Sequence, residues 1–489
     1  MNKLFILFAI LLLPLTGYAQ QFKVSFAKEL STQPFSGNVY IFLSKNDPEP
    51  IKASHWIMMN PVAVAKVSSL MPGQSFTLNA AKSEAYPVAL DAMERGEYFA
   101  QVLFDGNYGG RAVVSTVGNY YSAPQKVAFT HDLKKTFTLI ADKVITQAPF
   151  KDTAVTKRIE LPSPRLTAFY RKPSNIRAVL RLPKEYAEQA EQKFPLKVSI
   201  SGFGGNLTGL SGNTAPAPKD SDEIPFVQLL LDGNCPTGHS GYANSDNNGP
   251  WGDTLVYELI PYVEQNFRLN GFRFVTGHSS GGWSSLWLQS HYPDAFHGCW
   301  SSSPDAIDFR NFEGVNLYTD ANVFTDAKGK LLPGMTVGGS SYINYKKDVC
   351  AWERIVRSEQ YVSFNAVFSG RKADGSIDYL WDFKTGAINP AQRQQWRKYD
   401  IAQHLVSNWG TLKEKLAGKI LITTGDADNW ALEKAVQLLK KDAEEKKMEI
   451  AIQIFSGDHF TVFTTDRAKY GAQHTKQRYE AWLSQRVVR

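Results

Sequence analysis

The sequence predicts an α/β fold, a mostly parallel sheet with helices on both faces, preceded by an all-β, sandwich-like domain. Residues 22 to about 145 contain short apolar runs separated by turn residues, without a long segment of helical periodicity. From residue 165 onward, strand-like and helix-like segments alternate, which is typical of parallel sheets. The length of 489 residues also exceeds what one ordinary core supports, so two domains are expected.

The first residues, 1–19, have the pattern of a secretory signal peptide. Lys3 gives a basic start, residues 4–15 are almost wholly apolar, and Ala19 ends a small-residue cleavage pattern. No later segment reaches the roughly 18 apolar residues of a membrane-spanning helix. We therefore expect an exported protein, periplasmic or secreted, without membrane attachment after cleavage.

The β-rich domain is expected over residues 20–147, followed by a linker over 148–164. Alternating or apolar runs predict strands at 39–44, 98–104 and 136–140. Nothing in this domain suggests a chemical site, so its role is not predicted.

The catalytic domain is expected over residues 165–489. Its apolar runs predict strands, and its segments of helical spacing predict helices between them. The expected strands are 178–183, 194–201, 224–231, 272–276, 297–300, 419–424 and 448–455, and the expected helices are 254–267, 282–291, 430–447 and 467–488.

Composition excludes several classes of protein. The formal charge of +7 comes from scattered Lys and Arg pairs rather than a basic run, so no nucleic-acid partner is expected. Cys235, Cys299 and Cys350 are too few for a disulfide framework and leave room for at most one bridge. No pair of cysteines or histidines has zinc-ligand spacing, so neither a metal nor another cofactor is expected. The oligomeric state is not predicted.

The most informative motif is Gly-His-Ser-Ser-Gly at residues 277–281, between an expected strand and an expected helix. A serine at the centre of such a turn has a strained backbone and an exposed hydroxyl, which makes Ser279 a candidate nucleophile. The alternative is an ordinary loop rich in glycine and serine.

A serine nucleophile needs a base, and the base needs a carboxylate to orient it. His459 follows the last expected strand and is the candidate base; the alternative is a simple turn histidine. Asp428 and Asp426 both follow the strand at 419–424, at the edge where parallel sheets place their sites. We favour Asp428 as the acid, with Asp426 capping the turn or the following helix.

Acyl transfer also needs donors for a developing oxyanion. The backbone N–H of Ser280 is one candidate, and the N–H of Phe203, in the glycine-rich loop 201–206, is the other. Gly204 is the alternative to Phe203, and a plain glycine turn is the alternative to both.

Candidate substrate contacts are less specific. His278, Gly204 and Trp251 lie in or near the expected site loops. The stretch from about 304 to 415 is long and rich in aromatic residues, which suits a lid or a substrate-binding insertion. The alternative is that these rings form the core of an extra helical layer.

Several motifs together resemble one family. They are residues 181–186, 201–205, 248–253, 258–264, 277–282, 425–428 and 457–459. Over about residues 165–485 the chain resembles the putative-esterase branch of the α/β-hydrolases (esterase D-like, feruloyl esterase-like), which includes feruloyl and acetylxylan esterases, S-formylglutathione hydrolase and enterochelin esterases. The sequence departs from many relatives at Ser201, where they have histidine.

The resemblance implies an α/β-hydrolase fold and a serine carboxylic-ester hydrolase working through Ser279, His459 and Asp428. The expected substrate is a small-molecule or oligosaccharide ester, carbohydrate-linked or phenolic, of the feruloyl or acetyl type. The alternatives are a siderophore-type lactone esterase, a serine peptidase, or a non-catalytic binding protein with an inherited pocket.

Overall fold

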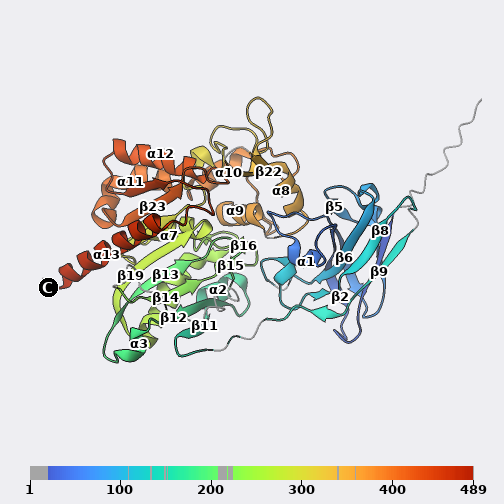
Figure 1. Cartoon of the computed structure of the whole chain (residues 1–489), viewed down its shortest axis with the longest axis horizontal. Helices are drawn as coiled ribbons and strands as arrows, with labels where there is room; N and C mark the ends of the chain where they lie inside the picture. The colour runs from blue at the N-terminus through green and yellow to red at the C-terminus, as the bar shows by residue number, and fades with distance from the viewer. Residues whose placement is uncertain are drawn as a thin grey trace, which may run out of the picture. The chain divides into compact units, whose positions relative to one another are not determined.

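The computed structural model describes most of the chain as two compact units. The described residues are 20–107, 109–132, 135–147, 150, 152–206, 217, 224–338, 341–357 and 359–487. The expected signal peptide, residues 1–19, lies outside them. The first unit comprises Met1–Ser54, Asn60–Gly106 and Asn119–Val144, and the second comprises His55–Met59, Asn107–Gly118 and Ile145–Arg489 (Figure 1).

The first unit contains two sheets around one apolar core. A three-stranded sheet has the order β4-β1-β9, and the larger sheet has the order β10-β7-β6-β2-β3-β5, with β8 paired to β6. The strands are β1 Gln21–Phe26, β2 Phe35–Ser44, β3 Val62–Leu70, β4 Phe76–Leu78, β5 Glu84–Tyr86, β6 Gly96–Asp105, β7 Tyr120–Tyr121, β8 Gln125–Phe129, β9 Thr136–Ala141 and β10 Lys143–Val144. Buried residues of β1, such as Phe22 and Val24, share a cluster with Val39 and Ile41 of β2, so both sheets cover the same core.

The second unit is built on an eight-stranded sheet of order β11-β12-β14-β13-β19-β20-β23-β24. Its strands are β11 Thr156–Pro162, β12 Asn175–Arg181, β13 Phe194–Ile200, β14 Val227–Leu231, β19 Leu269–His278, β20 Gly298–Ser302, β23 Ile420–Gly425 and β24 Ala451–Phe455. β12 pairs antiparallel with β11 and β14, and every pairing from β14 to β24 is parallel. The sheet is therefore mostly parallel, and its strand ends gather at one edge.

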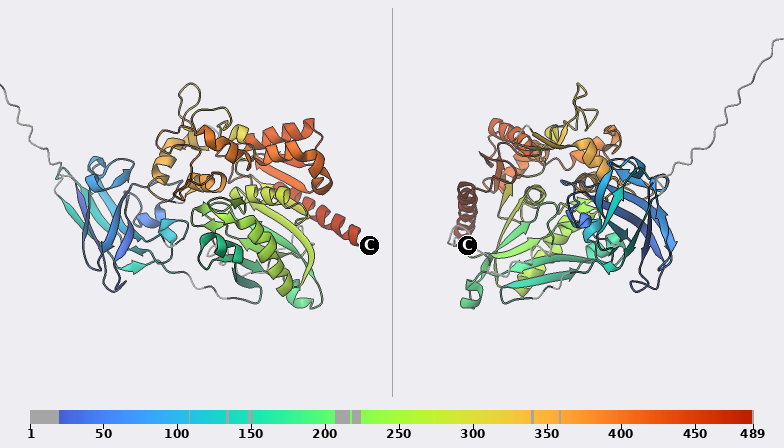
Figure 2. Two further views of the ribbon diagram at one scale, coloured as in Figure 1. Left: turned by 180° about the vertical axis from the view of Figure 1, so that it is seen from behind. Right: turned by 45° about the vertical axis from the view of Figure 1, so that its right-hand side comes forward.

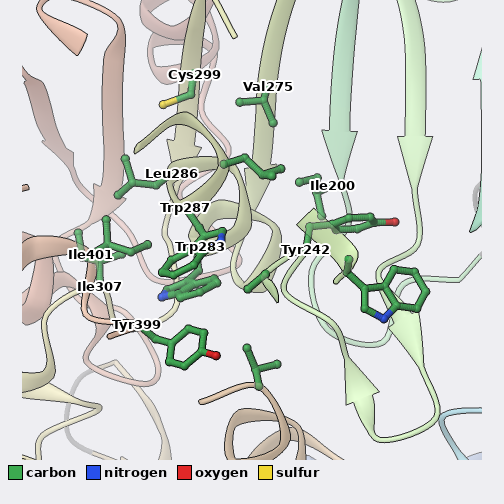
Figure 3. Packing of buried hydrophobic residues seen from close by; sticks show 14 of the residues in the cluster. Ile200, Tyr242, Val275, Trp283, Leu286, Trp287, Cys299, Ile307, Tyr399 and Ile401 are labelled. Carbon is green, nitrogen blue, oxygen red and sulfur yellow. The ribbon is translucent and has the colours of Figure 1, made fainter. Parts of the chain in front are cut away.

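Helices cover both faces of this sheet (Figure 1, Figure 2). The α-helices among the described residues of the second unit are α2 Pro164–Tyr170, α3 Glu185–Glu188, α5 Trp251–Thr254, α6 Ile260–Asn266, α7 Ser280–His291, α8 Lys346–Glu353, α9 Gln360–Phe368, α10 Pro390–Arg397, α11 Ile401–Leu416, α12 Leu432–Glu445 and α13 Thr465–Val487. Neighbouring residues of β19 point to opposite faces: Val275 shares a cluster with Leu286 of α7, and Phe274 shares another with Trp482 of α13. Figure 3 shows the first of these clusters.

Two expectations about the chain's organisation need correction. Thr156–Pro162, inside the expected linker, is strand β11 and pairs antiparallel with β12 along seven residues. An edge strand buries little of its surface, so its apolar pattern is too weak to identify from sequence. The large aromatic rings of the insertion are mainly core rather than a platform, because they are buried in the main cluster. These rings are Trp352, Tyr361, Trp381, Trp396, Tyr399 and Trp409.

The described part of the chain contains no helix that is long and apolar enough to cross a membrane. All three cysteines are buried and free, so the one bridge that the sequence allowed does not form. Among the same residues, no group of three or more His, Cys, Asp or Glu side chains could hold a metal ion.

Candidate active site

Ser279 lies on a sharp turn between β19 and α7. Its backbone has φ 60° and ψ −127°, a strained combination for a residue other than glycine. The flanking glycines make the turn possible, because a Cβ on Gly277 would lie 2.2 Å from the Gly281 oxygen, and one on Gly281 2.1 Å from the Ile200 oxygen. The turn therefore presents the Ser279 side chain at the carboxyl edge of the sheet.

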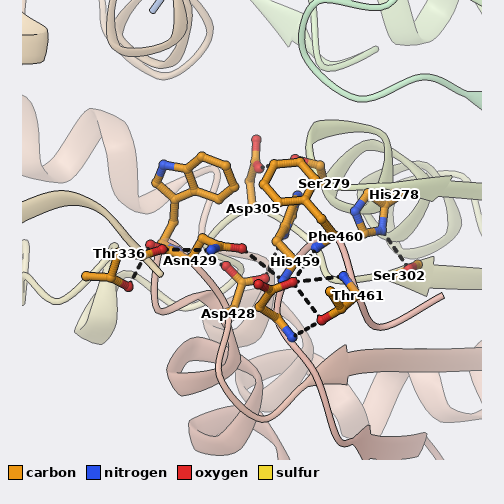
Figure 4. Close-up of polar contacts among 12 residues, drawn as sticks. His278, Ser279, Ser302, Asp305, Thr336, Asp428, Asn429, His459, Phe460 and Thr461 are labelled. Carbon is orange, nitrogen blue, oxygen red and sulfur yellow. Dashed lines mark hydrogen bonds and ion pairs between the residues drawn. The ribbon is translucent and has the colours of Figure 1, made fainter. Parts of the chain in front are cut away.

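His459 and Asp428 meet at the same edge, in the loops that follow β24 and β23. The His459 Nδ1 lies 2.6 Å from Asp428 Oδ2 (Figure 4). The backbone N–H of Trp430 donates to the other Asp428 oxygen at 3.0 Å, and Asn429 Oδ1 accepts from the His459 N–H at 3.1 Å. The loop contacts therefore hold both members of the pair in place.

Asp426, the other acid considered, plays a different part. It is exposed and accepts a hydrogen bond from the Gly457 N–H at 3.0 Å. The structure thus places Asp428 beside the histidine and uses Asp426 to join the two loops.

Ser279 and His459 line one cavity of about 370 Å³. In this structure the Ser279 hydroxyl donates to Asp305 Oδ1 at 3.3 Å, and the described residues show no hydrogen bond from it to His459. Ser279 and His459 therefore share a cavity, Asp428 contacts His459 from outside the cavity lining, and the serine hydroxyl is turned toward a second carboxylate.

Asp305 is a site residue that the sequence did not reveal. It follows β20 by three residues and so reaches the same edge of the sheet. Its Oδ2 accepts a hydrogen bond from the Ser280 hydroxyl at 2.5 Å and a longer one from the Gln360 amide at 3.4 Å. Burial disfavours the charged form and raises the pKa of Asp305 to about 6, although the Ser280 hydrogen bond opposes this shift. The available signal was weak, a carboxylate a few residues after an expected strand.

The loop 201–206, which contains the expected oxyanion donor Phe203, is fixed by hydrogen bonds from His239 and Asn234. His239 Nδ1 accepts from the Gly241 N–H, so its Nε2 carries the proton and donates to the Ser201 oxygen at 3.1 Å. Burial lowers the pKa of His239 to about 4, which is consistent with this neutral ring. The amide of Asn234 donates to the Gly205 oxygen at 2.8 Å, and these contacts fix the loop at both ends.

The two candidate oxyanion donors are available. Ser280 is the first residue of α7, a position whose N–H has no intrahelical acceptor. Phe203 lines the cavity, and within the described residues its N–H has no acceptor. Gly204, the alternative donor, has φ +90°, and a Cβ there would meet nothing within 4 Å.

The two remaining candidate substrate contacts, His278 and Trp251, differ in their position relative to the cavity. His278 lines the cavity, its Nδ1 lies 2.9 Å from the Ser302 hydroxyl, and its ring centroid is 4.4 Å from that of His459. Burial, with smaller contributions from His459 and Arg467, lowers the pKa of His278 to about 3. Trp251 is buried, donates its indole N–H to the Asn248 oxygen at 2.9 Å, and is not one of the described residues that line the cavity.

The cavity wall is mostly aromatic. The rings on it are Trp56, Phe203, Tyr361, Trp430, Phe460 and Phe463. Trp56 comes from His55–Met59, the short segment that belongs to the second unit although it interrupts the first in sequence. Trp430 lies edge-on to His459 with ring centroids 5.0 Å apart. The insertion contributes Asp305, Glu313, Gly334, Val349, Gln360 and Tyr361 to the wall, and Tyr361 is the one ring of its large buried set that lines the described cavity.

Glu313 also lines the cavity, and it forms an ion pair with a lysine. Its Oε2 lies 2.7 Å from the Lys346 ammonium and accepts from the Tyr361 hydroxyl at 2.9 Å. Its charge is therefore compensated within the protein.

Comparison with known proteins identifies a family and several similar solved structures. The sequence profile of the putative esterase family matches residues 172–488. No curated protein sequence matches the chain. Similar solved structures include a ferulic acid esterase (12% identity, 68% of this chain and 100% of that one, TM-score 0.40) and an S-formylglutathione hydrolase from Agrobacterium tumefaciens (15% identity, 67% and 97%, TM-score 0.40). A fluorophosphonate-binding serine hydrolase from Staphylococcus aureus is similar at 14% identity over 65% of this chain and 96% of that one, with a TM-score of 0.39.

The family match covers more than half of the chain, so the protein belongs to the putative esterase family. It is an ester hydrolase whose mostly parallel sheet is covered by helices, with an N-terminal β-rich region.

Proposed function

We propose that Ser279, His459 and Asp428 form the catalytic triad of a carboxylic-ester hydrolase that works through an acyl-enzyme. The observation that carries this proposal is the 2.6 Å contact between Asp428 and His459, which lines the same cavity as Ser279. The carboxylate at Nδ1 leaves Nε2 of the neutral imidazole free to accept a proton.

In the proposed reaction the Ser279 hydroxyl turns from Asp305 toward His459 and attacks the ester carbonyl. His459 takes the hydroxyl proton as the Oγ–carbon bond forms, and gives it to the departing alkoxide as the carbon–oxygen bond breaks. Water then attacks the acyl-enzyme, again losing its proton to His459, and the acid is released while Ser279 is reprotonated.

The developing oxyanion would be stabilised by the N–H groups of Ser280 and Phe203. Support comes from their free amides and from the contacts of His239 and Asn234, which fix the second donor's loop. Donors held in place before the reaction need no reorganisation in the transition state.

The cavity supports a preference for an apolar or aromatic acyl group. Its wall carries six aromatic rings, and its volume of about 370 Å³ is in the usual range for a small ligand. Esters with an aromatic acyl group are therefore the proposed substrates, and the phenolic, carbohydrate-linked esters expected from the sequence are one type within this class. Acetyl esters would leave much of the cavity empty.

The test is hydrolysis of p-nitrophenyl acetate by the wild type and by Ser279→Ala. We expect a burst and turnover in the wild type, and a loss of about three decades or more in the variant. Ser290→Ala is a matched control, because Ser290 lies on the same helix and donates to the Trp287 oxygen outside the cavity. Equal activity in wild type and Ser279→Ala would contradict the triad.

A peptidase and an esterase can be distinguished by the leaving group that each enzyme releases. The same acyl group on an ester and on an anilide should give turnover of the ester alone if the protein is an esterase. Faster release of the aniline would favour a peptidase.

We also propose that the enzyme is exported, on the basis of the basic, apolar and small-residue pattern of residues 1–19. N-terminal sequencing of the mature protein should begin at Gln20. An intact Met1 on the active protein would contradict export.

A further inference from the structure

The wall beside Ser279 contains more hydrogen-bond acceptors than donors. Asp305 is 6% exposed and lines the cavity. Its hydrogen bonds within the described residues come from two hydroxyls and one amide, and no cation is paired with it there. A buried carboxylate without a cationic partner is costly and is a mark of functional sites.

Gln360 contributes a second buried acceptor to this wall. Its amide N–H faces Asp305 at 3.4 Å and Ser280 at 3.5 Å, which fixes the orientation of the amide group. Its Oε1 is buried and has no hydrogen-bond partner among the residues that the structure describes. Buried oxygens of this kind are normally satisfied, so the empty acceptor points to a donor that arrives with a ligand.

The proposed reaction makes the imbalance larger. When the Ser279 hydroxyl turns to His459, Asp305 Oδ1 loses the donor that it has in this structure at 3.3 Å. Leaving a buried acceptor unsatisfied is costly, and more so for a charged group. A donor on the bound substrate would remove this cost at the moment of attack.

We propose that Asp305, assisted by Gln360, selects acyl groups that carry a hydrogen-bond donor, a hydroxyl or an ammonium, on the carbon next to the ester carbonyl. This inference rests on Ser279 being the nucleophile. A substituent on that carbon is two bonds from the carbonyl carbon that Ser279 attacks, so it reaches the carboxylate beside the serine. The rest of the acyl group would lie against the aromatic wall.

The competing explanation is structural. Asp305 also lies at the N-terminus of α7, where a carboxylate is stabilised by the helix dipole. A purely structural role would change folding stability but would not change the ratio of activities on two esters. The test therefore uses that ratio.

Three ethyl esters provide the comparison: those of 3-phenylpropionic acid, 2-hydroxy-3-phenylpropionic acid and 2-amino-3-phenylpropionic acid. They share the leaving group and the ring and differ only in the donor on carbon 2. We would measure kcat/KM at pH 7. The proteins are the wild type, Asp305→Asn and Asp400→Asn. Asp400 is a matched control because it is buried, its pKa is raised to about 6 by burial, and it lies outside the cavity lining.

In the wild type we expect kcat/KM for at least one donor-bearing ester to exceed that of the plain ester about tenfold or more. This ratio should fall about tenfold in Asp305→Asn and stay unchanged in Asp400→Asn. Loss confined to the amino ester would identify an ammonium as the natural donor. Loss confined to the hydroxy ester would identify a hydroxyl.

A wild type that hydrolyses all three esters equally would overturn the inference and leave the esterase function intact. So would a preference that persists in Asp305→Asn. A wild type inert on these esters and on p-nitrophenyl acetate would instead overturn the proposed function itself. If Asp305→Asn does not fold, the wild type decides alone: its preference should favour a hydroxyl on carbon 2 over one on carbon 3, and equal rates would overturn the inference.

Discussion

The imidazole of His459 lies 2.6 Å from the carboxylate of Asp428, and both side chains are almost completely buried. They come from loops after β23 and β24, which are neighbouring parallel strands. Because adjacent parallel strands end at the same edge, a separation of about thirty residues in sequence becomes a direct contact.

Replacing Asp428 by asparagine should keep the shape of the loop but remove the acceptor that fixes the histidine tautomer. We expect kcat to fall by about 10³–10⁴. Asp426→Asn is the matched control, because Asp426 is exposed and joins the loops through the Gly457 N–H. Its kcat should fall by less than about tenfold, and a comparable loss in the two variants would contradict the assignment of Asp428.

Two glycine-to-alanine changes should have opposite effects on stability. Gly281→Ala would place a methyl group 2.1 Å from the Ile200 oxygen, so the turn must distort, and both melting temperature and activity should fall. Gly410 lies in the exposed part of α11, with nothing within 4 Å of an added Cβ, and Gly410→Ala should raise stability by about 0.5–1 kcal/mol. Thermal unfolding and kcat/KM of the two variants check this. An unchanged melting temperature and kcat/KM in Gly281→Ala would show that neither stability nor activity needs the close packing of the turn.

The pKa of Asp305 should make stability depend on pH. Burial raises this pKa from 3.8 to about 6, so between these values the folded state binds more protons than the unfolded state. The stability of the wild type should therefore decrease as pH rises through this window, with a total contribution of at most about 3 kcal/mol. Asp305→Asn lacks this contribution, so it should gain stability relative to the wild type between pH 4 and pH 7. Chemical denaturation at both pH values measures the difference, and a difference independent of pH would contradict a raised pKa.

The cysteines should be inert in the folded protein. All three are buried, and burial raises the pKa of Cys235 to about 11 and those of Cys299 and Cys350 above their ordinary value. A thiol-specific reagent at pH 8 should therefore titrate none of them in the native state and all three after denaturation. Reducing agents should leave the melting temperature unchanged. A shift on reduction would indicate a disulfide.

The sequence was informative where the signal is local. The strand expected at 272–276 is the centre of β19, Leu269–His278, and the helix expected at 282–291 is α7, Ser280–His291. The expected helix at 254–267 is instead interrupted by a π-helical segment, Leu255–Leu259. Pro261 explains this difference, because it has no N–H to complete the regular hydrogen bonds of a continuous α-helix.

The sequence was uninformative where a site residue depends on distant partners. Asp305 becomes a site residue only through three contacts that are distant in sequence. Ser279 contacts it from the turn before α7, Ser280 from α7 and Gln360 from α9. None of these contacts leaves a pattern in Ser-Ser-Pro-Asp itself. The same holds for Trp56, which lies far from the catalytic residues in sequence and lines their cavity in the structure.

The left-handed backbone of Ser279 has an evolutionary consequence. Glycine adopts positive φ without steric cost, whereas a strained non-glycine residue costs about 1–3 kcal/mol. A descendant of this protein that no longer needed hydrolysis could therefore become more stable by exchanging this one serine for glycine. Exchange of Ser279 for glycine would remove backbone strain and stabilise the folded state. Selection for the hydrolytic reaction is therefore what opposes this exchange.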